Sequence, residues 1–283
     1  MSAFVSPLRM KRRLADTILM IISLFLSVVI IFPVFYTFMA AFMTIGEFSQ
    51  YPPPIFPSSF LNFDNFIHVF TRVPMVRYMI NSFIVSAVGS AVRLTLSVLA
   101  AYAIVFFDFR GKNFVFFMVL GTMMLPGDTL IIANFLTISS LNLMDSYIGL
   151  MIVYFVSAVQ LFMCRQSFKT TPRELRDASF IDGCGNLGFI RHVLLPTSKP
   201  ILFTLYVQSF VSLWNLYLWP LLITNRTEMR TVQIGIAMLT TVDGVNYDIV
   251  MAGVASVLIP SFIIFVFLRK TIIRGMTSGA LVG

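Results

Sequence analysis

The residues that could carry covalent chemistry are few and scattered in this sequence. Its two histidines, His68 and His192, have no cysteine or carboxylate at metal-ligand spacing. Gly111-Lys112 lacks the preceding glycines of a phosphate-binding loop, and Asn113 stands where that loop has Ser or Thr. The chain has no Ser-His-Asp or Cys-His arrangement on one side of the membrane that it is predicted to cross. The sequence therefore predicts a protein without catalytic residues, metal site or bound cofactor.

Solute binding is a second possible chemistry, in the stretch SLWNLYLWPLL. Trp214, Asn215 and Tyr217 place aromatic faces beside an amide, which is what a sugar ring needs for stacking and hydrogen bonding. Aromatic residues near the end of an apolar stretch are also typical of the belt at a membrane–water interface. An amide has no place in such a belt and needs a partner or a cavity. The aromatic belt and the solute path both remain open.

Charged groups within apolar stretches are a third candidate. Arg93 lies near the middle of the apolar stretch 78–107, where an arginine costs roughly 2.5–3.5 kcal/mol on insertion scales. We expect it to face a bundle interior or an aqueous path, with Asp128 as the nearest candidate partner. Either the two form a structural ion pair or they line the solute path, for which Asn81 is a further candidate.

One long polar interval, 171–196, carries its own helix punctuation. Thr171 can cap a helix, Pro172 suits its first position, and Glu174 would complete a capping box. Gly183 follows Asp182 where that helix should stop, since glycine adopts the positive φ of a C-terminal cap at little cost. We expect a second short helix to begin at a cap on Asn186 and to end at Pro196, TPRELRDASFIDGCGNLGFIRHVLLP in all.

The first of these two helices is predicted to be amphipathic. Leu175, Ala178 and Ile181, with Phe180 less regularly, form an apolar stripe, while Arg173, Arg176 and Asp177 take other faces. Two short helices joined at a glycine make a compact knob that suits a groove on a partner protein. The alternative is an ordinary amphipathic loop without a special partner.

The composition dictates where these residues must be positioned. The 283 residues are 58% hydrophobic and 11% charged, which indicates an integral membrane protein. A span needs about 20 residues. We predict an all-α chain with six transmembrane helices at 17–41, 78–107, 113–137, 145–166, 199–224 and 248–270. The first is too long for a signal peptide, the third should kink at Pro126, and Asn62–Phe70 should form a short amphipathic surface helix.

The basic residues predict the orientation. If the N-terminus is cytoplasmic, 15 Lys and Arg residues fall on that side and 4 outside. Both termini and the 171–196 segment are therefore predicted to be cytoplasmic. Basic residues scattered between apolar stretches are explained by the orientation of the chain in the membrane. The net charge of +8 therefore does not indicate binding to nucleic acid. Cys164 and Cys184 fall on the same side, which argues against a structural disulfide.

The 171–196 segment resembles the EAA loop of permease subunits of ABC importers. Asp177, Ala178 and Ser179 stand in the Glu-Ala-Ala places, Gly183 in the glycine place and Leu195-Pro196 at the end. Asp keeps the charge of Glu with a shorter reach, and Ser replaces the second Ala.

Further stretches resemble the shorter permease of carbohydrate-type importers, the maltose G-subunit type. These are Asn81-Ser82, Ala100-Ala101-Tyr102-Ala103, Trp214-Asn215 with Tyr217, and the glycine-rich tail from Arg274-Gly275 to Gly279-Ala280. Met124-Leu125-Pro126, Leu143 to Tyr147 and Tyr217 to Leu221 look particularly like the glycerol-3-phosphate permease subunit.

The resemblance implies a type I permease fold, a single transmembrane domain over 1–283 with 171–196 as its cytoplasmic coupling loop. It implies a bacterial or archaeal cell membrane and an importer for a sugar or glycerol phosphate. It also implies three partners: a second permease, a dimeric ATPase that binds ATP and Mg²⁺, and an extracytoplasmic solute-binding protein. The residues implied to couple to the ATPase are Glu174, Asp177, Ala178, Ser179, Asp182, Gly183, Leu195 and Pro196.

Two other classes of function were weighed against this one. A secondary transporter could act alone, driven by protons or sodium through Asp128 and Arg93. Inverted repeats would favour it, and the sequence shows no convincing internal repeat. A membrane-embedded enzyme would need a polar catalytic cluster, which the sequence lacks.

Overall fold

A computed structural model describes residues 7–240 and 246–278, with side chains for 16–127, 129–240, 246–263 and 266. The protein is 77% helical, and the described residues contain no strand, as the all-α prediction requires. Two compact units form the chain. Unit 1 contains 1–72 and 239–258, and unit 2 contains 73–238 and 259–283. Each unit is described by itself.

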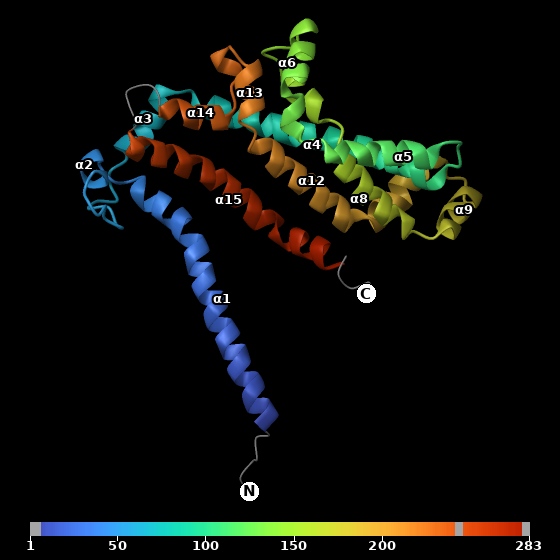
Figure 1. Ribbon diagram of the computed structural model, residues 1–283, viewed down its shortest axis with the longest axis horizontal. Coiled ribbons are helices and arrows are strands. Elements are labelled where there is room, and N and C mark those ends of the chain that lie inside the picture. The colour runs from blue at the N-terminus through green and yellow to red at the C-terminus, as the bar shows by residue number, and fades with distance from the viewer. Residues whose placement is uncertain (1–6, 241–245, 279–283) are drawn as a thin grey trace. The chain divides into compact units, whose positions relative to one another are not determined.

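Unit 1 combines a long apolar helix, two short helices and the first part of a second long helix. It contains α1 (Pro7–Ala40), α2 (Ile45–Phe48), α3 (Asp64–Arg72) and the first part of α15 (Tyr247–Ser278) (Figure 1). The buried Asn65 on α3 donates to the carbonyls of Ala41 and Met43, at 3.0 and 2.7 Å, and so fixes the chain that leaves α1. The surface helix expected at Asn62–Phe70 is therefore present as α3 and is anchored by this amide.

Unit 2 is organised around three long helices. These are α4 (Met75–Phe106), α8 (Ala158–Lys169) and α12 (Lys199–Trp214), and α4 packs along both of the others. Small residues on α4 permit this approach. A Cβ on Gly89 would lie 2.8 Å from a methyl carbon of Leu213 on α12, so a larger residue would require the Leu213 side chain to move.

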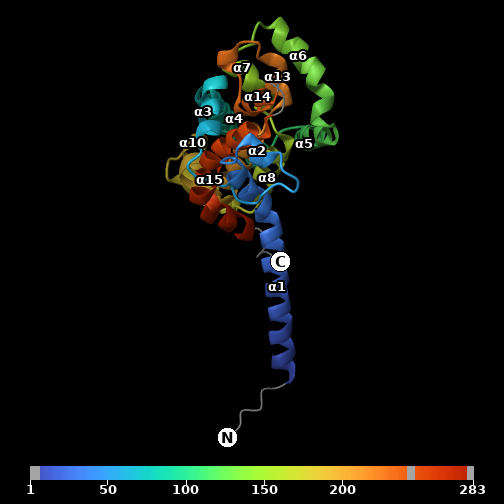
Figure 2. The same cartoon turned by 90° about the vertical axis from the view of Figure 1, so that its left-hand side faces the viewer.

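Shorter helices complete unit 2. They are α5 (Lys112–Gly121), η1 (Thr122–Met124), η2 (Gly127–Leu130), α6 (Ile131–Ser140), α7 (Tyr147–Met151), η3 (Ile152–Tyr154), α13 (Leu218–Ile223), η5 (Thr227–Met229) and α14 (Val232–Leu239). Contacts join α13 to α6 and to α7, and both views show these three helices gathered near the N-terminal half of α4 (Figures 1 and 2). The helix α14 was not predicted, because its eight mostly apolar residues are too few for a span.

All six predicted spans fall on helical segments, but the third, fourth and fifth are interrupted. The first, second and sixth correspond to α1, α4 and α15. The third is split into α5 and α6, the fourth into α7–η3 and α8, and the fifth into α12 and α13. By length and composition, two described helices can cross a membrane alone, Asp16–Ala40 and Met75–Phe106. The fourth predicted span qualifies only as a pair of helices bent by 55°.

Each interruption has a local cause. Leu125 is extended (φ −84°, ψ 124°) ahead of Pro126, because proline disfavours the helical conformation of the preceding residue. The predicted kink is therefore a complete break between η1 and η2. Ser157 caps α8 with its hydroxyl on the Gln160 amide, and Asn215 ends α12. Hydropathy alone does not reveal these caps, because the flanking residues on both sides are apolar.

The 171–196 segment forms two short helical pieces, as predicted, with different ends. The first is α9 (Arg173–Ile181), and the second runs through α10 (Asn186–Phe189), a π-helix η4 (Ile190–Leu194) and α11 (Leu195–Thr197). The predicted capping box is wrong, because Pro172 itself occupies the cap position and makes no side-chain bond. Asn186 is not a cap either, since that place falls on Gly185.

Pro196 does not end the second piece. A proline ring clashes with the carbonyl four residues earlier, and the wider π turn makes room for it. The Leu195 amide accordingly bonds to the carbonyl of Ile190, five residues back. The helix then reaches Ser198 and passes almost directly into α12. The segment is thus mechanically continuous with a long helix of unit 2.

Candidate functional site

The candidate coupling site is the segment 171–196, which we call the knob. Gly183 has φ +84° and closes α9. Its amide donates to the carbonyl of Phe180, at 3.1 Å, and the amide of Cys184 donates to the carbonyl of Ser179, at 2.9 Å. This pair of bonds is a Schellman motif, which confirms the predicted glycine stop. A Cβ on Gly183 would meet no atom within 4 Å, so glycine is needed here for its backbone conformation alone.

The knob presents apolar side chains outward. Ile181 is 86% exposed and Leu187 is 76% exposed, and Leu175, Ala178 and Phe180 are also exposed. The carboxylates of Glu174, Asp177 and Asp182 are exposed around them. Ser179 is the exception within α9, because it is buried and its hydroxyl donates to the carbonyl of Arg176 at 2.7 Å. Arg173 on α9 is exposed as well. Exposed apolar side chains among charged residues are typical of a protein-binding surface.

An apolar cluster holds the knob on unit 2. Phe189 is fully buried among residues of α4, α8 and α12, with its ring 5.3 Å from that of Phe106. The fully buried Leu194 belongs to the same cluster. A polar bond adds direction, since the Tyr102 hydroxyl donates to Oδ1 of Asn186 at 2.7 Å. Tyr102 lies in the stretch Ala100 to Ala103 and thus links that stretch physically to the knob.

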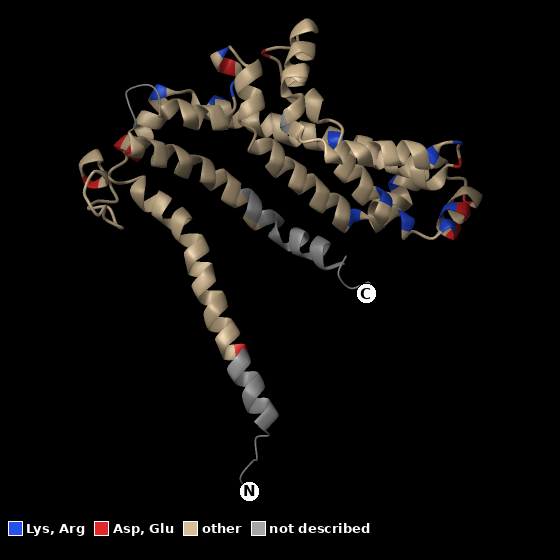
Figure 3. Cartoon of the chain, in the orientation of Figure 1, with Lys and Arg blue, Asp and Glu red and all other residues tan. Residues whose placement is uncertain are grey.

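The side chain of Arg176 stacks on two aromatic rings and so holds α9 against the end of α4. The guanidinium of Arg176 lies 5.0 Å from the ring centre of Phe180 and 5.7 Å from that of Phe107. Beyond Phe107, Asp108 pairs with Lys112 at 3.0 Å. The hydrogen bond and charge of Lys112 lower the pKa of Asp108, with smaller contributions from Arg173 and Arg176. Acidic and basic residues gather around α9, whereas long stretches of α8 and α12 carry none (Figure 3).

The solute-path candidates are not brought together as one site. Asn81 is fully buried, and its amide nitrogen donates to the carbonyls of Glu228 and Arg230 at 2.7 and 2.8 Å. Its oxygen accepts from the Tyr147 hydroxyl at 2.7 Å. Because these bonds engage both ends of the amide, Asn81 joins α4, α7 and the η5 turn. Its role in the solute path stays a prediction.

Arg93 has structural hydrogen-bond partners that the sequence did not indicate. Its Nε donates to the carbonyl of Tyr154, the last residue of η3, and its Nη1 donates to Oγ of Ser209 at 3.2 Å. The guanidinium therefore supplies a donor at the helix end where the fourth span bends. The side chain of Asp128 lies outside the described residues, so a pairing between the two stays a prediction.

The aromatic candidates are separated by burial. Trp214 is buried, with its ring 6.0 Å from Phe210 and stacked on it, so it offers no free face to a solute. Tyr217 and Asn215 are exposed at the break between α12 and α13. Asn215 donates to the carbonyl of Val211 and accepts from Gln233 of α14, at 3.0 and 3.4 Å. Asn215 and Tyr217 thus lie exposed near the half-buried Gln233, and the solute path stays a prediction.

Several residues that shape this end of unit 2 were missed. Asp145 adopts a left-handed conformation (φ 52°) and accepts from the amides of Asn225 and Arg226 at 2.7 and 2.8 Å. Trp219 is buried, and its indole donates to the carbonyl of Gly149 at 3.2 Å. An Asp after an apolar run is a turn signal that could have revealed the first. No group of described His, Cys, Asp or Glu side chains could hold a metal ion.

Comparison with known proteins defines the class. The family model for the binding-protein-dependent transport system inner membrane component matches residues 93–278. The chain belongs to this family, and it is the permease of a binding-protein-dependent importer. The resemblance to importer permeases is thereby confirmed.

Two curated relatives and one solved structure sharpen the comparison. The sn-glycerol-3-phosphate transport system permease protein UgpE of Yersinia pestis is 34% identical over 255 residues, 87% of this chain and 90% of the relative. The arabinooligosaccharides transport system permease protein AraQ of Halalkalibacterium halodurans is 33% identical over 261 residues, 92% and 94%. The crystal structure of a bacterial ABC transporter involved in the import of the acidic polysaccharide alginate has a chain with TM-score 0.79 and 20% identity. It covers 95% of this chain and 99% of that one, and it shows the permease fold.

Proposed function

We propose that this chain is the permease of an ATP-driven importer for a sugar or glycerol phosphate, and that the knob couples it to a partner ATPase. The observation that carries the coupling role is the outward apolar patch of α9 on a buried base. Ile181 and Leu187 are exposed, while Phe189, two residues after Leu187, is fully buried. A short helix with such a face suits a groove on a partner. ATP and Mg²⁺ would be bound by the partner and not by this chain.

The mechanical route from the knob to the membrane follows the chain. Lys169 ends α8 just before α9, and Thr197 leads into α12 with only Ser198 between the helices. Movement of the knob by a closing ATPase would therefore be applied to α8 and α12 together. Both helices pack on α4, so a rigid tilt of the three could open the path.

A pair of valine substitutions tests the coupling role. In Gly183→Val, a β-branched residue is forced to φ +84°, which should weaken the Schellman stop and misplace α9. In the control Gly185→Val, the backbone is extended (φ −80°, ψ −177°) and a Cβ meets no atom within 4 Å. Uptake by the complete transporter in vesicles should fall at least tenfold in the first variant and little in the second, with equal membrane insertion. Equal uptake in both variants would remove the coupling role.

The proposed solute class rests on the two relatives, whose names specify sn-glycerol 3-phosphate and arabinooligosaccharides. The exposed amide of Asn215, the half-buried amide of Gln233 and the exposed ring of Tyr217 are suited to hydroxyl-rich solutes. Radiolabelled glycerol 3-phosphate and a pentose oligosaccharide should be compared directly as transported solutes in vesicles that contain the complete transporter. Uptake of neither would exclude the proposed class.

We also propose that both termini and the knob face the cytoplasm, with a solute-binding protein and a second permease as further partners. Cys184 provides a native probe, because it is partly exposed in the knob while Cys164 is buried. A membrane-impermeant maleimide should label Cys184 in inside-out vesicles and not in right-side-out ones. Labelling in right-side-out vesicles would overturn the orientation. Cysteine cross-linking to the co-expressed subunits would identify the partner at α9.

An ion-coupled transporter that acts alone remains the alternative function. It requires Arg93 and Asp128 to exchange protons or sodium, whereas Arg93 is engaged at the end of η3. Vesicles that contain this chain without an ATPase should show no gradient-driven uptake. Uptake under a proton or sodium gradient alone would favour the alternative.

A further inference from the structure

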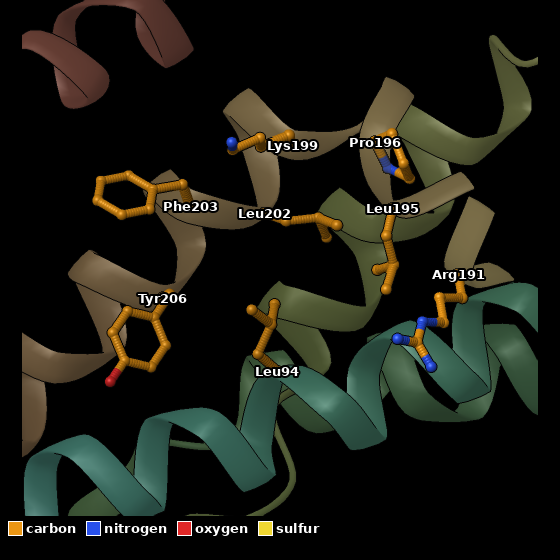
Figure 4. A pocket seen from close by; sticks show the side chains of 8 residues that line it. All are labelled: Leu94, Arg191, Leu195, Pro196, Lys199, Leu202, Phe203 and Tyr206. Atoms are coloured by element: carbon orange, nitrogen blue, oxygen red, sulfur yellow. The ribbon is translucent and has the colours of Figure 1, made fainter. Parts of the chain in front are cut away.

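A cleft lies where the knob joins α12 and is lined in part by Arg191, Leu195 and Pro196 of the knob. It is separate from the exposed apolar side chains of α9 and from the predicted solute path. It has a volume of about 650 Å³ and lies between α4, the π-helix, α11 and α12, all within unit 2 (Figure 4). Its walls consist of Leu94, Arg191, Leu195, Pro196, Lys199, Leu202, Phe203 and Tyr206.

The lining has a basic residue at each of two margins and an apolar floor. Arg191 of the knob and Lys199 of α12 lie on either side of Leu195, and Phe203 and Tyr206 lie farther along α12 (Figure 4). Seven residues separate Lys199 from Tyr206, so at 1.5 Å per residue the floor extends roughly 10 Å. The Tyr206 hydroxyl donates to the carbonyl of Ala87 at 3.3 Å, and this bond turns its polar atom toward α4. Its ring is then available as part of the apolar wall.

The positive charges of Arg191 and Lys199 are not balanced by an acidic residue of the cleft. Both are exposed, the lining contains no carboxylate, and among the described residues neither cation has a hydrogen-bond or ion-pair partner. Other bases near this end are engaged: Lys112 pairs with Asp108, and Arg176 stacks on two rings. The π-helix places Arg191 at the cleft and is followed directly by Leu195 and Pro196, which form one of its walls. The positive charge at this cleft favours an anionic group, and the apolar floor favours contact with a hydrocarbon chain.

We infer that this cleft binds one anionic phospholipid, with its phosphate between Arg191 and Lys199 and an acyl chain along Leu202, Phe203 and Tyr206. Basic pockets between helices at the cytoplasmic surface bind lipid head groups by this combination of charge and apolar contact. A free phosphate matches the cations but leaves the floor unused. A neutral lipid matches the floor but leaves the cations unmatched. The inference shares only the cytoplasmic orientation with the proposed function, and Cys184 labelling tests that orientation separately.

Native mass spectrometry of the complete transporter, purified with the subunits that accompany it, tests the assignment. The probe is palmitoyl-oleoyl phosphatidylglycerol, with the phosphatidylcholine of the same chains as the neutral comparison. The variant Arg191→Gln/Lys199→Gln removes both cations. The matched control, Arg110→Gln/Lys169→Gln, removes the same charge at exposed bases outside the cleft. Each cation near a membrane surface raises the affinity for an anionic lipid roughly fivefold.

The cleft variant should bind phosphatidylglycerol roughly 30-fold more weakly at one site, with phosphatidylcholine unchanged and the control normal. Phe203→Ala should weaken both lipids at that site by shortening the apolar contact. Retention of the phosphatidylglycerol site in the double variant would overturn the inference. Displacement of the lipid by millimolar glycerol 3-phosphate would instead assign the cations to the solute. A cross-link from Cys at position 195 to the second permease would show that protein covers the cleft.

Discussion

The two ends of the α4–α8–α12 bundle are built in different ways. At the end near α7 and α13, polar side chains bind backbone atoms of other segments. Asn81 engages η5 and α7, Asp145 engages the turn after α13, and Trp219 engages α7. Both ends also contain a buried apolar cluster, around Leu150 and Ile223 at the first end and around Phe189 and Leu194 at the knob end. The described residues at the knob end have fewer such cross-segment side-chain bonds, among them the bond from Tyr102 to Asn186.

We expect this difference in hydrogen bonding to make the α7–α13 end more rigid than the knob end. Hydrogen bonds depend on direction and distance, so a network of them resists rotation of the elements that it joins. Apolar packing is non-directional, and a cluster can shift slightly as a body without losing its burial. A coupling element must transmit motion, and the end with fewer of these hydrogen bonds carries the knob. The predictions below test each end with one disruptive change and one matched control.

The largest effect is expected at the base of the knob. Phe189→Ala removes a fully buried ring from the apolar cluster and should lower the free energy of unfolding by about 3–5 kcal/mol. Leu187→Ala, two residues earlier, trims an exposed side chain and should cost less than about 0.5 kcal/mol. Thermal unfolding of the two variants in detergent measures the contrast. Similar melting temperatures would show that Phe189 does not support the knob.

The polar end should be broken by loss of one amide. Asn81→Leu leaves two carbonyls and the Tyr147 hydroxyl without their partner and should cost about 2–3 kcal/mol. Asn215→Leu removes an amide of the same type that is exposed and bonded mainly within its own helix. It should change stability by less than about 0.5 kcal/mol. Equal losses in both variants would contradict the claim that hydrogen bonds fix this end.

The sequence predicted the parts of this architecture that depend on local signals. The six apolar stretches are helical, the chain is a permease of the expected family, and Gly183 closes α9 with positive φ. A glycine stop depends on a few neighbouring residues, and an apolar stretch depends on composition alone. Both are therefore visible without knowledge of what packs against them.

The features that the sequence did not predict depend on long-range partners. The sequence favours the solute path for Asn81, and either an ion pair with Asp128 or the solute path for Arg93, whereas each of the two bonds a residue more than 60 positions away. Trp214 was offered as a sugar platform and is stacked on Phe210 instead. The breaks at Ser157 and Asn215 are hidden because both flanks of each are apolar. A polar residue in a span needs a partner, but the sequence does not say whether that partner is a solute or another helix.

Loss of the Tyr102–Asn186 hydrogen bond should destabilise the knob less than loss of the buried Phe189 ring. Tyr102→Phe keeps the buried ring and removes the bond to Asn186, so it should cost about 1 kcal/mol. Tyr217→Phe removes an exposed hydroxyl and serves as the control. The maleimide reaction of Cys184 should be modestly faster in Tyr102→Phe, because the loop between α9 and α10 loses one tether. An unchanged reaction rate would show that the apolar cluster alone positions the knob.

The smallest effect is expected in unit 1, where a polar staple closes a short loop. Glu47 accepts from the amide of Ser58 at 2.7 Å and from the amide of Thr44 at 2.8 Å. Hydrogen bonds from Ser58 and then Thr44 lower the pKa of Glu47 from 4.5 to about 2. The folded carboxylate is therefore favoured above pH 4.5, and its contribution to stability is lost as the pH falls from 4.5 toward 2. Pepsin cleavage within 44–58 should then accelerate severalfold relative to Glu47→Gln as the pH falls from 4.5 to 2.5. Taking the ratio of the two proteins cancels the pH dependence of pepsin itself. A constant ratio would mean that this staple, unlike the bonds of Asn81, does not hold its loop.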